Sequence, residues 1–358
     1  MSNIAMLVHS TKKTGIVRVV LNLAHAFKTQ NINTWFFVLS NNDDCQDLID
    51  GFPTIFISGH SVSQKYRQFS NELKKHEKQG TIFYAILGHC YASYQFLRKV
   101  KHYNIYLCIH QSYGHNLDSL GYIKRFLYKQ KHRINFTNQN LICVSQGIKD
   151  SLTKKLGIRA KTIYVIHNPI DMTKIQNLAR EKTSDLPRKK PYIVYVGTLT
   201  KRKNLNLLLH AYTTIENKLF DIVIVGTGSE ESNLKQIVSS MNLSDKVFFL
   251  GWKQNPYPYI AQAKLLVLTS KREGFPLVLA ESLALGTPAV STNCPHGPAE
   301  ILTTPLSKYL VPPDDAITLG QTIMDAIEHP PLLEKEYRDR FNAQHIAAIY
   351  IDKIRPSL

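Results

Sequence analysis

The segment KLLVLTSKREGFPLVLAESLALG, residues 264–286, is predicted to form a buried strand, a loop and a helix in direct succession. Pro276 suits the first helical position, because the proline ring fixes φ near a helical value. Glu273 then lies in the loop and Glu281 inside the helix. An unpaired buried carboxylate is costly, so both acids need partners elsewhere in the chain or on a ligand.

The same succession of apolar runs and amphipathic stretches continues along the whole chain. Ten runs have strand character: 4–10, 33–40, 81–87, 104–110, 140–145, 162–168, 192–198, 220–226, 246–252 and 264–270. Near-continuous apolar strands separated by helices indicate parallel sheets that are covered on both faces. Two such series predict an α/β protein with two doubly wound, Rossmann-like domains.

The division into domains follows from length and from one polar segment. A chain of 358 residues suits two domains better than one core. The segment REKTSDLPRKKP, residues 180–191, is charged and contains two prolines, which is typical of a linker. We therefore expect an N-terminal domain over 1–170, a linker over 171–191, a C-terminal domain over 192–340 and a final helix over 341–358.

Composition favours a folded cytoplasmic protein. Hydrophobic residues make up 44% of the chain and charged residues 20%, which excludes a disordered chain. No apolar run approaches the length that spans a bilayer. The N-terminal charges follow a short apolar run, the reverse of a secretory signal. The five cysteines are scattered without a CxxC pair, which argues for reduced thiols and against a disulfide framework or a zinc site.

The net charge of +17 is unevenly distributed. Residues 1–170 carry +14 and residues 171–358 carry +3. A basic half predicts an anionic partner, and nucleic acid, anionic lipid, a phosphorylated acceptor and a merely basic surface all remain open. Within that half, GYIKRFLYKQKHRINF (121–136) mixes aromatic residues with five cations. It predicts either contact with an anionic membrane surface or an ordinary helix whose aromatics face the core.

Glu273 and Glu281 flank a predicted helix start. Eight residues at helical rise span about 12 Å, roughly the distance between the two ends of a diphosphate bridge. The free amides of the first helical turn favour an anion between the two acids. One acid could then hold sugar hydroxyls and the other ribose hydroxyls. The alternative is that Glu273 is a surface loop acid and Glu281 a residue at the rim.

A second candidate element is YVGTLTKRKNLNLLLHAY, residues 195–212. Gly197 lets the backbone approach a ligand, and the adjacent cations Arg202 and Lys203 could neutralise a diphosphate. VIVGTGSEESNL, residues 223–234, predicts another strand–glycine–helix turn. Taken alone, each pattern is weak evidence for a ligand site, because turns in α/β proteins need glycine anyway and most runs of charged residues are simply solvated surface.

Together these motifs resemble the retaining glycosyltransferases of family four. The resemblance rests on Gly197–Leu199 with Lys203, on Gly226–Gly228, and on FLGW, EGFPLVLAES and GPAEIL, and it is strong over 192–302. It implies the GT-B architecture, in which two Rossmann-like domains face a cleft. We further expect the C-terminal helix to cross back to the N-terminal domain. The E-x7-E element from Glu273 to Glu281 is quite specific to the family.

The N-terminal half matches the family more loosely. TGIVRVVLNLAHAF, residues 14–27, keeps the glycine of the first loop as Gly15 and has Val17 where an acid is often found. LCIHQ contains His110 at the position of the active-site histidine. His89, which also follows a strand, is expected to be a structural histidine, and His115 ranks below His110.

The resemblance implies roles for individual residues. Glu273 binds donor-sugar hydroxyls, Lys203 neutralises the diphosphate, and His110 approaches the donor sugar; these three are the catalytic candidates. Thr198 stands where many members have an arginine, and Arg202 is the proposed substitute. The full set expected to bind the donor is Gly15, Gly197, Thr198, Arg202, Lys203, Gly274, Phe275, Pro276, Leu277, Val278 and Glu281, with Glu281 on the ribose.

The implied reaction moves a hexose or N-acetylhexosamine from a nucleotide sugar, most simply a UDP sugar, with retention at the anomeric carbon. The expected acceptor is a lipid-linked or lipopolysaccharide glycan of a bacterium. The enzyme is expected to be peripheral on the inner face of the cytoplasmic membrane, with an anionic membrane surface as a partner and no nucleic acid. No cofactor or metal is expected, because the chain lacks D-x-D and the acids at 41–47 and 312–315 are typical of loops.

Two alternatives remain at this stage. The first is a non-catalytic protein that binds polyanions or nucleic acid through its basic half. The second is a GT-B enzyme that uses a nucleotide sugar without transfer, such as a phosphorylase or an epimerase. The chain shows no recognisable pyridoxal-phosphate lysine motif, which disfavours a phosphorylase.

Overall fold

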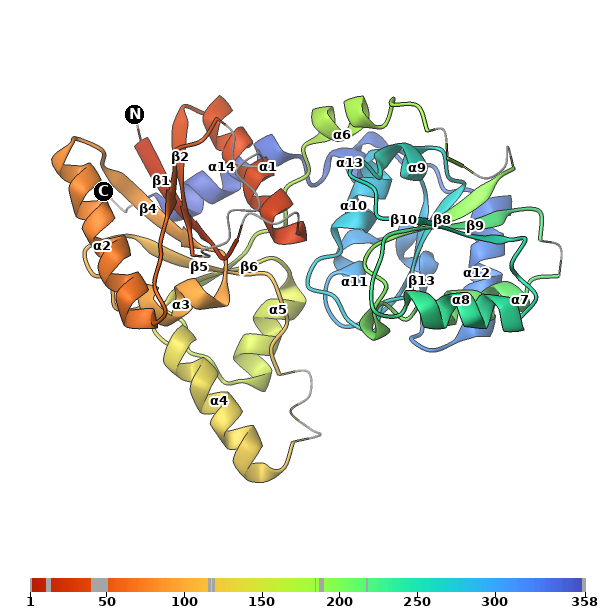
Figure 1. Ribbon diagram of the computed structural model, residues 1–358, viewed down its shortest axis with the longest axis horizontal. Helices are drawn as coiled ribbons and strands as arrows, with labels where there is room; N and C mark the ends of the chain where they lie inside the picture. Colours follow the sequence, from red (N-terminus) through yellow and green to blue (C-terminus); the bar gives the residue numbers. More distant parts are fainter. Residues whose placement is uncertain are drawn as a thin grey trace. The chain divides into compact units, whose positions relative to one another are not determined.

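The chain forms two compact units (Figure 1). The computed structural model describes residues 2–10, 14–39, 51–114, 117, 120–183, 185–186, 190–216 and 218–355. Unit 1 comprises Met1–Ile170 and Asn342–Leu358, and unit 2 comprises Asp171–Phe341. The chain thus leaves unit 1 once and returns to it, and the two crossings lie side by side, since the amide of Ala343 donates to the carbonyl of Ile170 at 2.9 Å.

Unit 1 is built on a parallel seven-stranded sheet in the order β3-β2-β1-β4-β5-β6-β7. Its strands are β1 Ser2–Val8, β2 Ile32–Val38, β3 Thr54–Phe56, β4 Phe83–Gly88, β5 Ile105–Ile109, β6 Asn140–Cys143 and β7 Thr162–Val165. Its helices are α1 Gly15–Thr29, α2 Val62–Lys78, α3 Tyr91–Leu97, α4 Tyr122–Phe136, α5 Gln146–Asp150, the π-helix η2 Ser151–Lys155 and α14 Ala343–Ile354.

Unit 2 is built on a parallel six-stranded sheet in the order β10-β9-β8-β11-β12-β13. Its strands are β8 Tyr192–Val196, β9 Asp221–Val225, β10 Val247–Gly251, β11 Leu265–Leu268, β12 Ala289–Thr292 and β13 Leu310–Val311. Its helices are α6 Met172–Leu178, η3 Lys201–Lys203, α7 Leu205–Thr213, α8 Glu231–Ser240, α9 Tyr257–Ala261, α10 Leu277–Ala284, α11 Pro298–Ile301, η4 Leu306–Tyr309, α12 Ala316–Glu328 and α13 Lys335–Asp339.

Both sheets confirm the predicted α/β class with two doubly wound, Rossmann-like units. In each sheet the strand order reverses beside the first strand, between β1 and β4 in unit 1 and between β8 and β11 in unit 2. Ligands of doubly wound sheets bind at the carboxyl ends of the strands at such a point of reversal. A ligand site in unit 2 is therefore expected at the loops that follow β8 and β11.

The C-terminal helix confirms the expected crossing. α14 belongs to unit 1 and buries one face against α1, where the rings of Phe27 and Tyr350 meet edge to face with centroids 6.2 Å apart. Two side chains at the start of β5 hold the C-terminal end of α14. Tyr106 Oη donates to the carbonyl of Lys353 at 3.0 Å, and Asn104 Nδ2, from the residue just before β5, donates to the carbonyl of Ile354 at 2.6 Å. The final helix, expected over 341–358, begins at Ala343 and ends at Ile354, and the separate short helix α13 precedes it.

Other elements differ from the sequence-based expectation. β3, β12 and β13 were not predicted, because they have three, four and two residues and carry no long apolar run. The segment 171–191, expected to be a linker, begins with α6. Asp171 caps this helix by accepting from the amide of Lys174 at 3.0 Å. In the part of the chain that the structure describes, no helix is long and apolar enough to cross a bilayer.

Candidate functional site

Two glycine loops interlock at the carboxyl ends of β8 and β9. The amide of Leu199 donates to the carbonyl of Thr227 at 3.0 Å. A Cβ on Gly226 would lie 1.9 Å from the carbonyl oxygen of Gly197, and a Cβ on Gly228 would lie 2.2 Å from that of Leu199. Neither position has room for a side chain, so the two loops pack together through backbone contact at these glycines.

We expect Gly226→Ala to lower the free energy of unfolding by about 2 kcal/mol, because the added methyl group would push against a backbone carbonyl at a φ of +139°. Urea unfolding measures the change. Gly286→Ala is the control for φ alone, since its φ is +82° and no atom lies within 4 Å of its added Cβ. An equal loss in both variants would show that close packing against Gly197 is unimportant.

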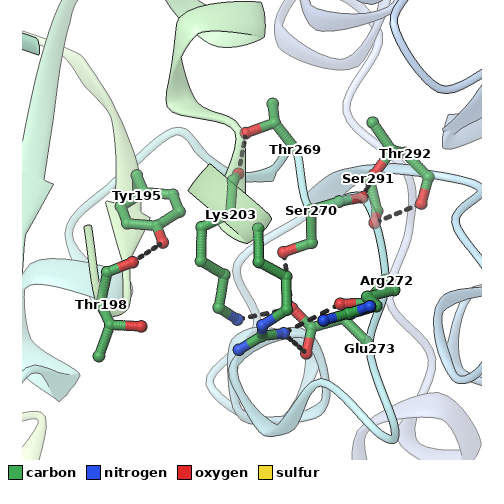
Figure 2. A network of polar contacts seen from close by, with 10 residues as sticks. Tyr195, Thr198, Lys203, Thr269, Ser270, Arg272, Glu273, Ser291 and Thr292 are labelled. Atoms are coloured by element: carbon green, nitrogen blue, oxygen red, sulfur yellow. Dashed lines mark hydrogen bonds and ion pairs between the residues drawn. The ribbon is translucent and has the colours of Figure 1, made fainter. Parts of the chain in front are cut away.

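The buried carboxylate of Glu273 contacts two cations beside the switch point of unit 2, the place between β8 and β11 where the strand order reverses (Figure 2). Glu273 Oε1 lies 2.5 Å from Lys203 Nζ, and Glu273 Oε2 lies 3.3 Å from Arg202 Nη1. Ser270 Oγ donates to Oε1 at 2.6 Å, and Arg202 Nη1 also donates to the carbonyl of Arg272 at 2.9 Å. The loop after β8 thus supplies the cations and the loop after β11 supplies the acid.

Electrostatics keep this carboxylate ionised. Burial alone would raise the pKa of Glu273, whose side chain is 9% exposed. Lys203, the hydroxyl of Ser270 and Arg202 outweigh burial and hold the pKa below its usual value. The charge of Glu273 is therefore balanced within the protein, and the two cations leave the cluster with a net positive charge that favours an anionic ligand.

Hydrogen bonds to the backbone hold the loop that carries Glu273. Thr269 Oγ1 donates to the carbonyl of Lys203 at 3.0 Å, and Thr292 Oγ1 donates to that of Ser270 at 2.7 Å (Figure 2). The amide of Glu273 donates to the carbonyl of Pro295 at 3.2 Å. A Cβ on Gly297 would lie 2.5 Å from Pro276 Cδ, so the GPAEIL segment packs closely on this loop. The carboxylate is positioned by β8, β11 and β12 together.

Glu281 has a separate environment. It lies inside α10, is 2% exposed, and accepts a hydrogen bond from Tyr257 Oη at 3.2 Å. The two acids of the E-x7-E element therefore have different partners: Glu273 pairs with cations, and Glu281 with a tyrosine hydroxyl. The alternative that Glu281 is a residue at the rim is wrong, because its side chain is buried.

The segment between the acids forms the start of α10. Pro276 is the N-cap residue, not the first helical residue as expected, and α10 begins at Leu277. Phe275 packs edge to face on Phe341 with ring centroids 5.1 Å apart. Gly274 is partly exposed, as are Leu277 and Val278. The five expected donor-binding residues from Gly274 to Val278 thus lie in one continuous turn.

The remaining expected donor-binding residues lie after β8 and at the start of α1. Gly197 and Thr198 follow β8, and the carbonyl of Thr198 accepts from Tyr195 Oη at 3.0 Å (Figure 2). Gly15 is the first residue of α1 in unit 1, after the N-cap Thr14. Val17, which stands where the family often has an acid, is buried in the core of unit 1. At Gly15 and Gly197 the absence of a side chain leaves the backbone accessible to a close contact.

His110 pairs with a histidine that sequence reasoning assigned to structure. His89 follows β4 and His110 follows the neighbouring β5, and His89 Nδ1 lies 3.0 Å from His110 Nε2. Burial lowers the pKa of His110 to about 4, and burial and His110 lower that of His89. His89 Nε2 and His110 Nδ1 have no hydrogen-bond partner among the described residues. The pair is therefore neutral at physiological pH.

We expect the pair of His89 and His110 to make the folded state less stable in acid. A histidine with a lowered pKa in the folded state binds fewer protons than in the unfolded chain, so its contribution to stability is lost as pH falls from about 6.5 to about 4. We expect the free energy of unfolding to drop by about 3 kcal/mol over this window through His110 alone. Urea unfolding at several pH values measures this drop. His110→Gln should flatten the profile and His102→Gln, an exposed control, should not; identical profiles would contradict the prediction.

The structure brings together some of the predicted residues. Arg202, Lys203 and Glu273 meet at one carboxylate, and Glu281 lies in the same unit. Ser270 and Tyr257 were missed. His115 and the acids at 41–47 lie outside the described residues. Among the described residues, no group of three or more His, Cys, Asp or Glu side chains could hold a metal ion. The individual roles in donor binding stay predictions.

Two family models match consecutive parts of the chain. Residues 13–174 match the model "Glycosyltransferase Family 4", and residues 177–345 match the model "Glycosyl transferases group 1". Each model covers most of one unit, and together they cover most of the chain.

Curated relatives share these regions. The chain is 31% identical over 196 residues to N-acetylgalactosamine-N,N'-diacetylbacillosaminyl-diphospho-undecaprenol 4-alpha-N-acetylgalactosaminyltransferase of Campylobacter jejuni, a match that covers 55% of this chain and only 52% of that relative. It is 27% identical over 320 residues to lipopolysaccharide 1,6-galactosyltransferase of Salmonella typhimurium, covering 84% of this chain and 82% of that relative.

Solved structures show the same fold. The apo form of the lipopolysaccharide outer core galactosyltransferase WaaB matches with a TM-score of 0.74 at 20% identity, covering 99% of both chains. Anabaena Alr3699/HepE, solved in complex with UDP and glucose, matches with a TM-score of 0.76 at 17% identity, covering 98% of this chain and 99% of that one. These likenesses confirm the GT-B fold that the sequence motifs implied.

Proposed function

Because the chain belongs to the group 1 and family 4 glycosyltransferases, whose two models match residues 13–174 and 177–345, we propose that it transfers a sugar from a nucleotide-sugar donor to a glycan acceptor. The observation that carries the proposal is the cluster of Lys203, Arg202 and Glu273 at the switch point of unit 2. A net positive charge beside a buried carboxylate suits a ligand that has a diphosphate next to sugar hydroxyls.

The proposed donor is a UDP-hexose or a UDP-N-acetylhexosamine. The neighbouring structure of HepE holds UDP and glucose, and the Salmonella relative is named a galactosyltransferase. In this chain Glu281 would accept hydrogen bonds from the ribose, with Tyr257 orienting its carboxylate. Glu273 would accept from sugar hydroxyls. The turn from Gly274 to Val278 would offer amides to phosphate and sugar.

The proposed acceptor is a lipid-linked or lipopolysaccharide glycan. The Campylobacter relative is named for a diphospho-undecaprenol substrate, and the Salmonella relative for lipopolysaccharide. Both are bacterial, and such acceptors are held at a membrane. We therefore also propose that the enzyme works at the inner face of the cytoplasmic membrane, where nucleotide sugars are available.

The proposed chemistry needs no metal. The bond from the anomeric carbon to the diphosphate oxygen breaks, the acceptor oxygen bonds to the same face of that carbon, and the acceptor proton passes to the leaving phosphate. The transition state resembles an oxocarbenium ion. Lys203 and Arg202 would stabilise the negative charge that grows on the diphosphate, the task that a divalent ion performs elsewhere. The pair of His110 and His89 in unit 1 is neutral, and by the family resemblance His110 is proposed to act on the donor sugar.

Metal independence is directly testable. We expect transfer to be unchanged by excess EDTA, because Lys203 and Arg202 supply the positive charge. Release of the nucleotide diphosphate in the presence of acceptor measures the rate. A loss of activity that Mg²⁺ or Mn²⁺ restores would contradict the proposal.

The test of the proposed function is a calorimetric panel of UDP, GDP, ADP and CMP sugars. We expect one nucleotide class, that of UDP, to bind. Glu281→Gln should weaken the binding of UDP about 30-fold, since hydrogen bonds to a charged group contribute about 2 kcal/mol. The surface acid Glu231, which pairs with Lys235 on α8, provides the matched control Glu231→Gln.

The rival from another class is a protein that binds polyanions through its basic N-terminal half without catalysis. It predicts salt-sensitive binding of DNA or RNA that Glu281→Gln leaves unchanged. Binding of no nucleotide sugar together with such nucleic-acid binding would overturn the proposed function. Hydrolysis or epimerisation of the sugar without transfer to any acceptor would favour the non-transferring enzyme.

A further inference from the structure

Two histidine rings contact each other at the carboxyl edge of the unit 1 sheet. His89 Nδ1 lies 3.0 Å from His110 Nε2, and the ring centroids are 5.3 Å apart with planes inclined by 31°. Each ring has one further nitrogen, and neither His89 Nε2 nor His110 Nδ1 has a hydrogen-bond partner among the described residues. Because a buried polar atom without a partner costs free energy, these two nitrogens require an explanation.

The strands of unit 1 hold both rings in this arrangement. His89 directly follows β4, and His110 directly follows β5, the neighbouring strand. The amide of His89 donates to the carbonyl of Leu7 on β1 at 2.9 Å. Beyond β5, the amide of Val144 donates to the carbonyl of Ile109 at 3.2 Å. The contact between the rings is therefore set by hydrogen-bonded strands, which position side chains more precisely than loops do.

The tautomers of the two rings are coupled. Burial lowers the pKa of His110 to about 4 and that of His89 well below its usual value, so both rings are neutral and each carries one proton. The hydrogen bond between them needs one donor and one acceptor. Either His89 Nδ1–H donates and His110 carries its proton on Nδ1, or His110 Nε2–H donates and His89 carries its proton on Nε2. Each arrangement leaves one N–H and one lone pair without a partner.

Burial favours the first arrangement. His89 is 1% exposed, whereas His110 is partly exposed. An N–H that lacks an acceptor inside a protein is rarer than an acceptor that lacks a donor. The N–H without a partner therefore belongs on His110, the ring nearer the surface, and the lone pair without a partner belongs on His89 Nε2.

We propose that His89 is a positioning residue, whose Nδ1–H donates to His110 Nε2 and thereby keeps the proton of His110 on Nδ1, facing a hydroxyl oxygen of the donor sugar. The identity of that sugar rests on the proposed function, but the state of the two rings does not. Without His89, the ring of His110 would lose its orienting partner and take the Nε2–H form that a free neutral imidazole prefers. Its Nδ1 would then present a lone pair in place of a proton.

Nitrogen-15 NMR of the histidine rings tests the tautomers in the full chain at neutral pH, without donor or acceptor. We expect wild-type His110 to be protonated on Nδ1 and His89→Leu to move this proton to Nε2. His89→Asn should keep the wild-type form, because the Nδ2 of asparagine lies near the place of histidine Nδ1 and still donates. The spectrum of His110→Gln assigns the signals. A wild-type His110 protonated on Nε2 would overturn the proposal, whatever the variants do.

Transfer kinetics test the consequence for the reaction. His89→Leu should lower kcat about 10-fold, because the ring that faces the sugar loses its orientation and its proton, and should leave the affinity for UDP within about twofold. His89→Asn should recover most of kcat. His60→Leu is the matched control, since His60 is exposed in the same unit, and it should behave like the wild type.

Circular dichroism should show all of these variants folded. An undiminished kcat in His89→Leu would overturn the positioning role, as would an equal loss in His89→Leu and His89→Asn. A chain that transfers no sugar from any donor would overturn the proposed function instead, and the NMR spectra would still decide which nitrogen of His110 carries the proton.

Discussion

Lys203→Met is expected to lower the free energy of unfolding by about 3 kcal/mol and the rate of transfer by about 10²–10³. Removing Lys203 leaves the buried carboxylate of Glu273 without its 2.5 Å partner. The loss of stability falls at the low end of the range for a broken buried pair, because Arg202 Nη1 still contacts Oε2 at 3.3 Å. The rate falls because the leaving diphosphate loses a cation.

Urea unfolding and the release of UDP from a UDP sugar measure the two effects of Lys203→Met. Lys201→Met is the matched control, because Lys201 is exposed in the same short helix η3 and carries the same charge. The stability cost should shrink under acidic conditions, where Glu273 of the variant becomes protonated and needs no partner. If Lys201→Met and Lys203→Met behave alike, the buried pair has no special role.

The fold was predictable wherever strands form long apolar runs. β8 and β11 lie within the predicted runs 192–198 and 264–270, because both faces of a central parallel strand are covered and every residue can be apolar. β12, with the sequence AVST, is equally buried but has only four residues, two of them hydroxylated. Their hydroxyl groups are satisfied locally: Ser291 Oγ donates to the carbonyl of Thr292, and Thr292 Oγ1 to that of Ser270. Composition alone gives no sign of such a strand.

The site was predictable in its residue types and only partly in its pairings. Lys203 and Glu273 are 70 residues apart, and they meet because β8 and β11 are neighbours in the sheet. The spacing of the two residues in the sequence does not show that β8 and β11 are neighbours, so the sequence alone does not predict that Lys203 pairs with Glu273. Ser270 is the last residue of the predicted strand 264–270, and nothing in the sequence marks it as a hydrogen-bond partner of Glu273. Tyr257 carries no sequence signal that links it to Glu281, since the contact depends on how α9 packs beside α10.

The histidine pair could have been found from the sequence. His89 directly follows β4 and His110 directly follows β5, and consecutive strands of a parallel sheet are often neighbours. Two histidines at the carboxyl ends of neighbouring strands are expected to lie close together. His89 was assigned to structure because it was considered alone, and its 3.0 Å contact with His110 was therefore not foreseen.

Glu273→Gln is expected to reduce transfer about 100-fold while leaving the affinity for UDP nearly unchanged. The substitution keeps the size of the side chain but removes the charge that would accept sugar hydroxyls, and a hydrogen bond to a charged group contributes about 1.5–3 kcal/mol. UDP lacks the sugar, so its binding should depend on Glu281 and not on Glu273. Calorimetry with UDP and with the UDP sugar, beside steady-state rates, separates the two acids.

Stability provides the second readout for Glu273→Gln. The variant leaves Lys203 and Arg202 close together without their shared carboxylate, so we expect a loss of about 3 kcal/mol in the free energy of unfolding. The double variant Lys203→Met with Glu273→Gln should lose about 2 kcal/mol less than the two single losses combined, because neither group is then left unpaired. Additive losses would mean that the contact between Nζ and Oε1 contributes nothing to the fold. A parallel loss of UDP affinity in Glu273→Gln would instead move this carboxylate from the sugar to the nucleotide, and with it the assignment of the two ends of the E-x7-E element.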